Sequence, residues 1–527
     1  MLYNNFYGAR GGSPLRARIA NGGTELPVLR MTNESNGTGP CMKSNIIKAA
    51  ALILLSVFAC AALVSCANGN DSPALEHSVT WYFSEKDQMT SFFSDDRLLP
   101  DKIAGAITAI GVPDGRQGFV TAATALYRID TEGLLKIYPA AVTNAVTSLN
   151  TRFILFATSS KIFLYDNEAR EYAELPDIEA KRTVSLVLSP DGGTAGVSVL
   201  DSEGRVVSYI YQNGRTAKYG DDLCLCAVSN GGEISYYMPV SEGELTGELY
   251  YRARGKDKLV AQRVSNYFEV NRDLSEITFD VGSKTHISRN GEKAVQLVDG
   301  SVFSWAGAQY ASQGGAAVTT LLKNCGTLLN SVFYTSYTAS DSSGNKYTRY
   351  NVYYIDKTLS ASKLAGGASQ FSVSKSGAEI LCVVDNGLYR VSAFSPQSPE
   401  TVAAGVGSFC CSEDFKTLYI VDVYGNLRQC TDGTISKILV TGVGLAKLTE
   451  RNVVICLAPY DDNGTLLWLR DDKADTIAGN VSYFDVYRHM CVYLTNYNAD
   501  KGTYDLYTSA DGVSYELAIE SVRIGNQ

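Results

Sequence analysis

From about residue 105 onward, the chain repeats one pattern of apolar and polar positions. Each unit has a turn signal, an apolar strand, a second turn, a tyrosine-rich strand and a short closing strand that ends near glycine. The clearest copy begins at Ser189-Pro190-Asp191-Gly192, continues as an apolar strand to Val199, turns at residues 201–204 and resumes at Val206–Tyr211. Residues 228–237, 373–381 and 411–420 begin in the same way.

Ten positions mark the start of a unit when the copies are aligned on the first turn. They are Pro113, Asn150, Pro190, Asn230, Arg272, Asn330, Lys375, Glu413, Arg451 and Arg488. Neighbouring positions are 37 to 45 residues apart, except for one gap of 58 between Arg272 and Asn330. This period predicts about four short strands per unit. The long gap holds either a degenerate unit or the junction between two halves.

Repeats of four antiparallel strands at this period predict an all-β fold, a β-propeller over residues 105–523. An array of immunoglobulin-like domains is the alternative, but its units need about 100 residues. Ten starts exceed the usual four to eight blades. We therefore expect one large propeller of seven to ten blades, with a shared or partial unit, and two smaller rings as the alternative.

A separate apolar segment, Met42–Cys66, lies before the repeats. Two lysines open it, and the apolar run of residues 49–63 is shorter than the roughly 20 residues of a membrane span, which favours a cleaved leader. Leu63-Val64-Ser65-Cys66 has the form of a lipobox and resembles the processing site of bacterial lipoproteins. The resemblance implies a signal peptide over residues 42–65 and acylation of Cys66.

The other segments outside the repeats carry no strong pattern. Residues 1–41 lack strand or helix periodicity, so we expect a start codon assigned too early or a disordered extension. A cytoplasmic extension on a signal anchor is the alternative, and it leaves the lipobox unexplained. We expect residues 66–104 to be a lipidated tether and a lead-in, in which residues 84–103 form a short helix or an extended segment.

The Ser189-Pro190-Asp191-Gly192 start followed by an apolar strand resembles the repeats of TolB-like and WD-repeat-like propellers. No Trp-Asp dipeptide recurs, so the eukaryotic WD-repeat pattern itself is absent. A lipobox before a propeller is also similar to the periplasmic propeller lipoprotein of the outer-membrane barrel-assembly machinery, although the Trp-bearing repeats of that protein are not matched. These resemblances imply a fold and an address rather than a function.

Charge and cysteine content narrow the function classes. The formal net charge of −9, without a basic run in the repeats, disfavours nucleic acid as a partner. Of the 12 cysteines, Cys41 and Cys60 precede the predicted cleavage site and Cys66 would carry the lipid. Nine remain, an odd number without regular spacing, which argues against a full disulfide framework and leaves an individual bridge open.

No residue pattern predicts catalysis, a cofactor or a metal site. The three histidines, His77, His286 and His489, are far apart, which disfavours a Ser-His-Asp triad or a histidine metal centre. Two S-x-x-K matches begin at Ser360 and Ser372, but both fall in strand and turn context. The pairs Cys224/Cys226 and Cys410/Cys411 do not have C-x-x-C spacing, and we expect packing roles for Cys224 and Cys226.

Turn motifs and tyrosines offer weaker functional signals. Acidic turns recur at residues 201–204, 341–345, 461–464 and 498–502, but none has a full calcium loop with a closing glutamate. Residues 509–515 resemble a shortened Asp-box, a structural turn of sialidase-like propellers. Tyrosine runs at residues 236–237, 250–251, 350–354 and 493–497 suit packing between blades, or else exposed stacking on sugars or protein partners.

The sequence therefore predicts a membrane-anchored, extracytoplasmic propeller lipoprotein that acts as a non-catalytic binding or scaffold protein. Its expected partners are the membrane, through the N-terminal lipid, and a protein or glycan ligand. The alternative is a cell-surface carbohydrate-binding or carbohydrate-processing protein. Carboxylates and tyrosines around a pocket favour the alternative, and an apolar binding face favours a protein scaffold.

Overall fold

The computed structural model describes residues 79–523, except residues 95, 113–116, 179–181, 241–246, 300–303, 306–311, 314–328, 341–343, 375, 432, 459–463 and 471–472. The described residues belong to one compact unit, Asp71–Gln527. The predictions for residues 1–41, the leader 42–65, the lipobox and Cys66 lie outside the described residues.

Strands dominate this unit, and a single 3-10 turn, η1 (Asn230–Gly232), is the one helical element among the described residues. The strands form nine hydrogen-bonded sheets in the described part of the chain. Seven of the sheets have four strands. The first of these contains β4 (Ile107–Gly111), β5 (Gly118–Ala122), β6 (Ala125–Ile129) and β7 (Leu134–Tyr138). The second contains β8 (Asn144–Thr147), β9 (Phe153–Ala157), β10 (Ile162–Asp166) and β11 (Glu171–Glu174). The third contains β12 (Arg182–Leu188), β13 (Thr194–Leu200), β14 (Val206–Gln212) and β15 (Arg215–Asp221).

The other four of these sheets lie later in the chain. They contain β23 (Ser304–Trp305), β25 (Ser331–Ser340), β26 (Lys346–Ile355) and β27 (Ala361–Ala368); β28 (Gln370–Val373), β29 (Glu379–Val384), β30 (Gly387–Ser392) and β31 (Glu400–Ala404); β32 (Val406–Cys411), β33 (Leu418–Asp422), β34 (Leu427–Thr431) and β35 (Thr434–Ile435); and β36 (Leu445–Leu448), β37 (Val454–Ala458), β38 (Gly464–Arg470) and β39 (Lys473–Val481).

One wide sheet combines two repeat units through a shared strand. It contains β16 (Leu223–Val228), β17 (Ile234–Pro239), β18 (Gly247–Ala253), β19 (Lys256–Val270), β20 (Glu276–Val281), β21 (Lys284–Arg289) and β22 (Val295–Asp299). The first part of β19 pairs with β18 as far as Val264, and the part from Val264 onward pairs with β20. The last strand of one unit thus continues directly as the first strand of the next.

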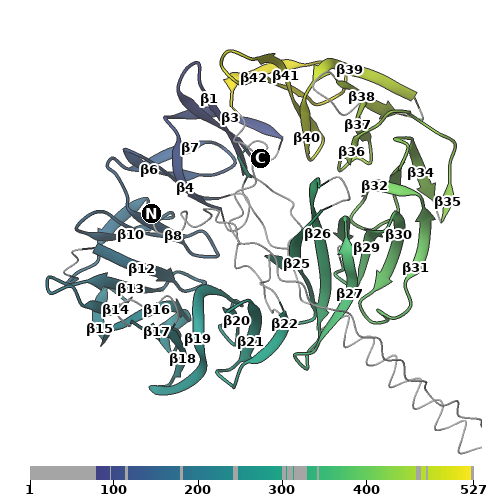
Figure 1. The fold of residues 1–527 in the computed structure, drawn as a ribbon. Helices are drawn as coiled ribbons and strands as arrows, with labels where there is room; N and C mark the ends of the chain where they lie inside the picture. Colours follow the sequence, from purple (N-terminus) through teal and green to yellow (C-terminus); the bar gives the residue numbers. More distant parts are fainter. Residues whose placement is uncertain are drawn as a thin grey trace, which may run out of the picture. The chain divides into compact units, whose positions relative to one another are not determined.

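The second wide sheet joins the two ends of the described chain. Its strands are β1 (Val79–Ser84), β2 (Met89–Ser94), β3 (Arg97–Ala104), β40 (Tyr483–Tyr487), β41 (Met490–Asn498), β42 (Thr503–Ser509) and β43 (Glu516–Val522), and β24 (Ser312–Gln313) pairs in parallel with β1. Ser84 of β1 is the register partner of Val522 of β43. Figure 1 accordingly shows the purple strands β1 and β3 beside the yellow strands β41 and β42.

Apolar clusters fill the space between neighbouring units. Leu155 of β9 packs in one cluster with Val197 of β13, and Phe93 of β2 packs in another with Val492 of β41. Eleven such clusters link the units in chain order and return to the first. Because each unit is covered on both faces, a middle strand such as β13 is buried along nearly its whole length.

These observations confirm the β-propeller fold. The nine sheets fall within the predicted range of seven to ten, but each wide sheet holds two repeat units, so the described residues contain eleven units. The additional unit is β1–β3, in the segment assigned to a lead-in: the strands begin at Val79 rather than at residue 105. The long gap after Arg272 contains β20–β22, which complete the unit that starts there. It then contains β23 and β24, which join other sheets, so the extra length after β22 connects units.

The predicted starts of the units lie in one recurring turn between the first and second strands. A Ser, Thr or Asn directly follows the first strand in seven of the described turns, at Ser148, Ser189, Ser229, Asn271, Ser374, Ser412 and Thr449. Its side-chain oxygen accepts a hydrogen bond of 2.9–3.1 Å from the backbone N–H four or five residues later. The residue three positions after it has positive φ in every case. The turn therefore satisfies a backbone group that the strands leave unpaired.

The Ser189-Pro190-Asp191-Gly192 start shows how the turn also joins neighbouring units. Asp191 Oδ1 accepts hydrogen bonds from the Ser189 hydroxyl (2.7 Å) and from a backbone N–H within the turn (2.9 Å). The Asn150 amide donates to the Asp191 carbonyl, and the Asp191 N–H donates to Asn230 Oδ1, both at 3.1 Å. Hydrogen bonds thereby connect three successive unit starts.

Candidate functional site

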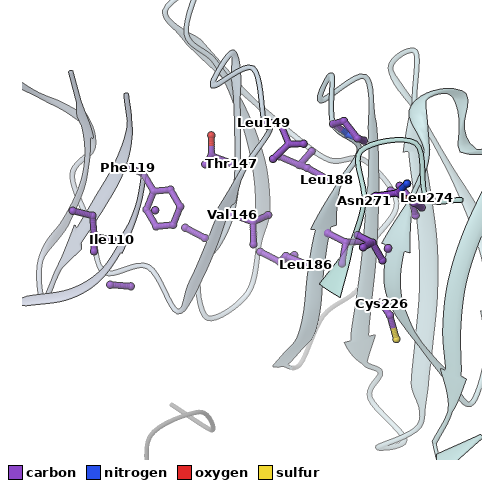
Figure 2. A pocket seen from close by; sticks show the side chains of 18 residues that line it. Ile110, Phe119, Val146, Thr147, Leu149, Leu186, Leu188, Cys226, Asn271 and Leu274 are labelled. Atoms are coloured by element: carbon purple, nitrogen blue, oxygen red, sulfur yellow. The ribbon is translucent and has the colours of Figure 1, made fainter. Parts of the chain in front are cut away.

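A cavity of ≈ 310 Å³ lies against the first strands of five consecutive units. Figure 2 shows the 18 residues that line it. They come from β4 and β5, from β8, β12 and β16, from the end of β19 and from the turns that follow: Ala109, Ile110, Gly111, Phe119, Ala145, Val146, Thr147, Leu149, Leu186, Val187, Leu188, Pro190, Cys226, Ala227, Val228, Val270, Asn271 and Leu274. None of these side chains is charged.

The local sequence explains why this lining is apolar. The first strand of each unit packs between neighbours, so it carries a short run of Ala, Val, Leu or Ile, as in Leu186–Leu188 and Ala227–Val228. The lining then changes at the recurring turn, where Leu149, Pro190 and Asn271 contribute. The cavity thus ends beside the polar turns that tie the units together.

The few polar atoms of the lining already have partners within the protein. The Thr147 hydroxyl donates to the carbonyl of Phe153 at 3.1 Å. Asn271 is buried, its Oδ1 accepts the Glu276 N–H at 2.9 Å, and its amide nitrogen donates to the Ser275 hydroxyl at 2.9 Å. The cavity therefore offers a ligand apolar contact more than hydrogen bonds.

The residues considered for catalysis lie apart. His286 stacks on Phe279 and belongs to β21, whereas His489 pairs with Asp96 at 3.0 Å near β40, and His77 lies outside the described residues. Lys363 of the first S-x-x-K match lies over the Tyr353 ring, and Lys375 of the second is not described. Within the described ranges, no group of three or more His, Cys, Asp or Glu residues is arranged to hold a metal ion.

One compact group of ionisable side chains lies on β36, β40 and β1. Lys447 Nζ is 2.6 Å from Asp485 Oδ1, and the Tyr483 hydroxyl donates to Asp485 Oδ2 at 3.3 Å. The hydroxyls of Tyr82 and Tyr487 lie 3.1 Å apart, and burial raises the pKa of both. Similar contacts join first strands elsewhere, since Gln370 bonds the backbone of Phe409 in the next unit. This group therefore connects blades.

The acidic turns use their carboxylates for local structure. Asp201 Oδ1 accepts the N–H groups of Glu203 and Arg205 at 2.9 Å each. In the segment that resembles an Asp-box, Asp511 accepts hydrogen bonds from the Ser514 hydroxyl and from the N–H groups of Val513 and Ser514, which hold the pKa of Asp511 at about 2. This turn joins β42 to β43. Parts of the turns at 341–345 and 461–464 lie outside the described residues.

The tyrosine runs are mostly packing positions. Tyr236, Tyr237 and Tyr251 are buried, and Tyr236 donates a hydrogen bond to the carbonyl of Leu274. Arg252 lies over the rings of Tyr219 and Tyr237 and pairs with Asp257 through two contacts of 2.6 and 3.0 Å. Tyr497 is the exposed member of its run. The buried tyrosines thus contribute to packing within and between blades, and no tyrosine lines the cavity.

The eight cysteines described are all free thiols, as the irregular spacing predicts. Cys226 lines the cavity, whereas Cys382 and Cys456 are buried between units. Burial raises the pKa of Cys382 and of Cys411 to about 11, and that of Cys456 to about 12. These thiols are therefore protonated near neutral pH and behave as small apolar side chains.

We expect iodoacetamide at pH 8 to react more slowly with the folded protein than with the protein in guanidinium, about 100-fold at Cys382 and Cys411 and about 1000-fold at Cys456, because the thiolate is the reactive form. Mass spectrometry of the three peptides measures the rates. These thiols ionise at a lower pH in the unfolded protein than in the folded protein. The free energy of unfolding should therefore fall as the pH rises from about 8.5 to about 11. Equal rates in both states would contradict the burial.

Neither the cavity nor the β1–β3 unit is evident from the sequence motifs. The cavity is lined by ordinary core-type runs from five units, and only the recurrence of such a run before each capped turn hints at a shared surface.

No helix among the described residues is long and apolar enough to cross a membrane.

Comparisons with known proteins give a structural likeness only. No protein-family model matches the chain, and no curated protein matches it. One similar solved structure is described as "Crystal structure of the eukaryotic initiation factor"; it is 12% identical, with a TM-score of 0.38, over 85% of this chain and 98% of that chain. At this level of similarity, the likeness says nothing about what this chain binds.

Proposed function

We propose that this chain is a membrane-anchored, extracytoplasmic β-propeller lipoprotein of TolB-like type that acts as a non-catalytic binding or scaffold protein. The apolar cavity at the first strands of five units is its binding site. The observation that supports this proposal is the lining, which combines a volume of ≈ 310 Å³ with the absence of any charged side chain. Sites for small molecules are typically concave, mostly apolar and about 300–1,000 Å³ in volume.

The same lining favours an apolar ligand or protein partner over a sugar. Sugar sites combine aromatic platforms with carboxylates or amides that bond the hydroxyl groups. Phe119 is the one aromatic lining residue, and no tyrosine or carboxylate is among the 18. The carbohydrate alternative therefore has no support from the cavity.

Binding is tested with 1-aminonaphthalene, a small fluorophore that brightens in apolar surroundings. Ala109 is an exposed residue of β4 that lines the cavity, so Ala109→Trp would fill space there without disturbing a buried position. We expect saturable binding by the full chain, held in an amphipathic polymer, and an affinity loss of at least tenfold in Ala109→Trp. Ala173→Trp, at an exposed position of β11, is the matched control and should bind as the wild type does. Equal binding by both variants would contradict the proposed site.

Anchoring is tested by Cys66→Ala. An acylated cysteine contributes about 0.8 kcal/mol of membrane affinity per buried methylene, so its loss should move most of the protein from the membrane fraction to the soluble fraction. Immunoblotting of the two fractions measures the shift. Cys60→Ala, within the predicted leader, removes a thiol without touching the lipobox and should leave the distribution unchanged. Membrane retention of Cys66→Ala at the wild-type level would overturn the lipoprotein proposal.

A further inference from the structure

Most side chains of the cavity lining are aliphatic, and Phe119 is the one aromatic among them. Figure 2 shows the labelled side chains in a row from Ile110 through Val146 and Leu186 to Leu274. These four come from β4, β8 and β12 and from the turn after β19, and β16 contributes Cys226, Ala227 and Val228 between the last two, so the lining passes through five units in chain order. A site built in this way suits a long, narrow ligand better than a compact one.

The size of the cavity limits the ligand. An apolar cavity of about 150 Å³ lined by Leu, Ile and Phe stays dry and holds one benzene molecule. The present cavity of ≈ 310 Å³ is about twice as large. It therefore has room for roughly a dozen carbon atoms.

The satisfied polar atoms limit the chemistry of the ligand. Thr147 and Asn271 already bond within the protein, so they add little recognition of a polar group. A ligand that brought amide or hydroxyl groups into the cavity would bury them without good partners, which costs about 1–3 kcal/mol for each group. A hydrocarbon chain brings none.

The turn end of the cavity suits a polar head group. Leu149, Pro190 and Asn271 line the cavity there, and their sequence neighbours Asn150, Asp191 and Arg272 are exposed. The hydrogen bonds between Asn150, Asp191 and Asn230 hold this rim together across three units. A chain that lies in the cavity can therefore leave its polar end in water, beside the turns.

We propose that the cavity binds a single aliphatic chain of about ten to twelve carbons, such as the acyl chain of a lipid or a fatty acid, with its head group at the capped turns. This inference rests on the proposed binding function and deepens it by naming the class of ligand. It requires no covalent step and no charged side chain in the lining.

A series of straight-chain 1-alkanols, from butanol to hexadecanol, tests the proposal by displacement of 1-aminonaphthalene from the full chain. Each methylene that enters the cavity should tighten binding about fourfold, and the gain should stop near ten to twelve carbons. Ala109→Leu narrows the cavity with an added isopropyl group and should move this limit about three carbons shorter. Ala173→Leu is the matched control and should leave the limit in place.

Two further arms distinguish the sources of the chain. Dodecanoate represents a free fatty acid, and vesicles of didodecanoyl phosphatidylglycerol represent a membrane lipid. Displacement by dodecanoate alone identifies a soluble ligand, and displacement by the vesicles identifies a membrane lipid; either result supports an aliphatic-chain site.

Three outcomes would overturn the inference. One is a bound probe that no alkanol displaces. Another is an affinity that keeps rising to hexadecanol equally in the wild type and Ala109→Leu, which would indicate partition into the polymer. The third is displacement by an apolar peptide but by no alkanol. In each of these cases 1-aminonaphthalene still binds, so the proposed binding function is not contradicted. If 1-aminonaphthalene did not bind at all, the proposed binding function itself would be contradicted.

Discussion

Replacing Phe93 with alanine should lower the free energy of unfolding by about 3–5 kcal/mol, the usual cost of removing a large ring from a filled core. Phe93 of β2 is fully buried and packs in one cluster with Val492 and Leu506, which belong to the last unit. Its ring centroid lies 5.8 Å from that of Tyr82 and 6.5 Å from that of Tyr487. The substitution therefore weakens the joint at which the first unit meets the last.

Phe394→Ala is the control for this prediction. Phe394 is 68% exposed, so its loss should change stability by less than about 0.5 kcal/mol. Chemical denaturation of both variants, followed by circular dichroism, gives the comparison. If Phe93→Ala proved as mild as Phe394→Ala, β1–β3 would not be an integral unit of the propeller.

The second large effect concerns Gly512, in the turn that resembles an Asp-box. Its φ is +72°, and a Cβ at this position would lie 2.5 Å from a ring carbon of Trp468 in the neighbouring sheet. Backbone strain of about 1–2 kcal/mol adds to an overlap that costs roughly 1–3 kcal/mol. We therefore expect Gly512→Ala to destabilise the protein by about 2–5 kcal/mol in the same denaturation experiment.

Gly502→Ala separates these two contributions. Gly502 lies in the other turn of β42 and has a φ of +63°, and a Cβ added to it would meet no other atom within 4 Å. The control should thus cost only the backbone strain, about 1–2 kcal/mol. Equal losses in both variants would show that the contact of Gly512 with Trp468 does not restrict the turn.

The repeats were predictable because their turns have a chemical signature. The signature is a Ser, Thr or Asn after an apolar run, followed by a residue that tolerates positive φ. Ser189-Pro190-Asp191-Gly192 shows both features, because Ser189 follows such a run and Gly192 has positive φ. All ten predicted starts fall, in sequence, between the first and second strands of a unit, and Asn330 directly precedes its second strand. Pro113 and Lys375 are themselves outside the described residues. Local turn chemistry therefore identifies the period before any packing is known.

The first unit escaped prediction because it lacks that signature. The turn between β1 and β2 contains Glu85 and Asp87, and β3 contains Pro100 and several charged residues, so the segment resembles a polar lead-in. Its partners, such as Val492, are some 400 residues away. Burial of Tyr82 and Phe93 depends on that distant contact, which single-sequence patterns do not report.

The cavity was unpredictable for a related reason. Leu186 and Val228 belong to runs that are identical in character to those filling the interfaces between blades. Whether such a run faces a neighbour or a cavity depends on how five units are arranged, and no local pattern records this.

Photoaffinity labelling tests the central claim, that the apolar cavity at the first strands is the binding site, most directly. The full chain is irradiated with a small apolar aryl diazirine, and the modified peptides are mapped by mass spectrometry. We expect labelling to be concentrated on β4, β8, β12 and β16 and to be lost in Ala109→Trp but not in Ala173→Trp. Labelling concentrated instead on exposed aromatic residues such as Phe394 and Tyr424, unchanged in Ala109→Trp, would contradict it.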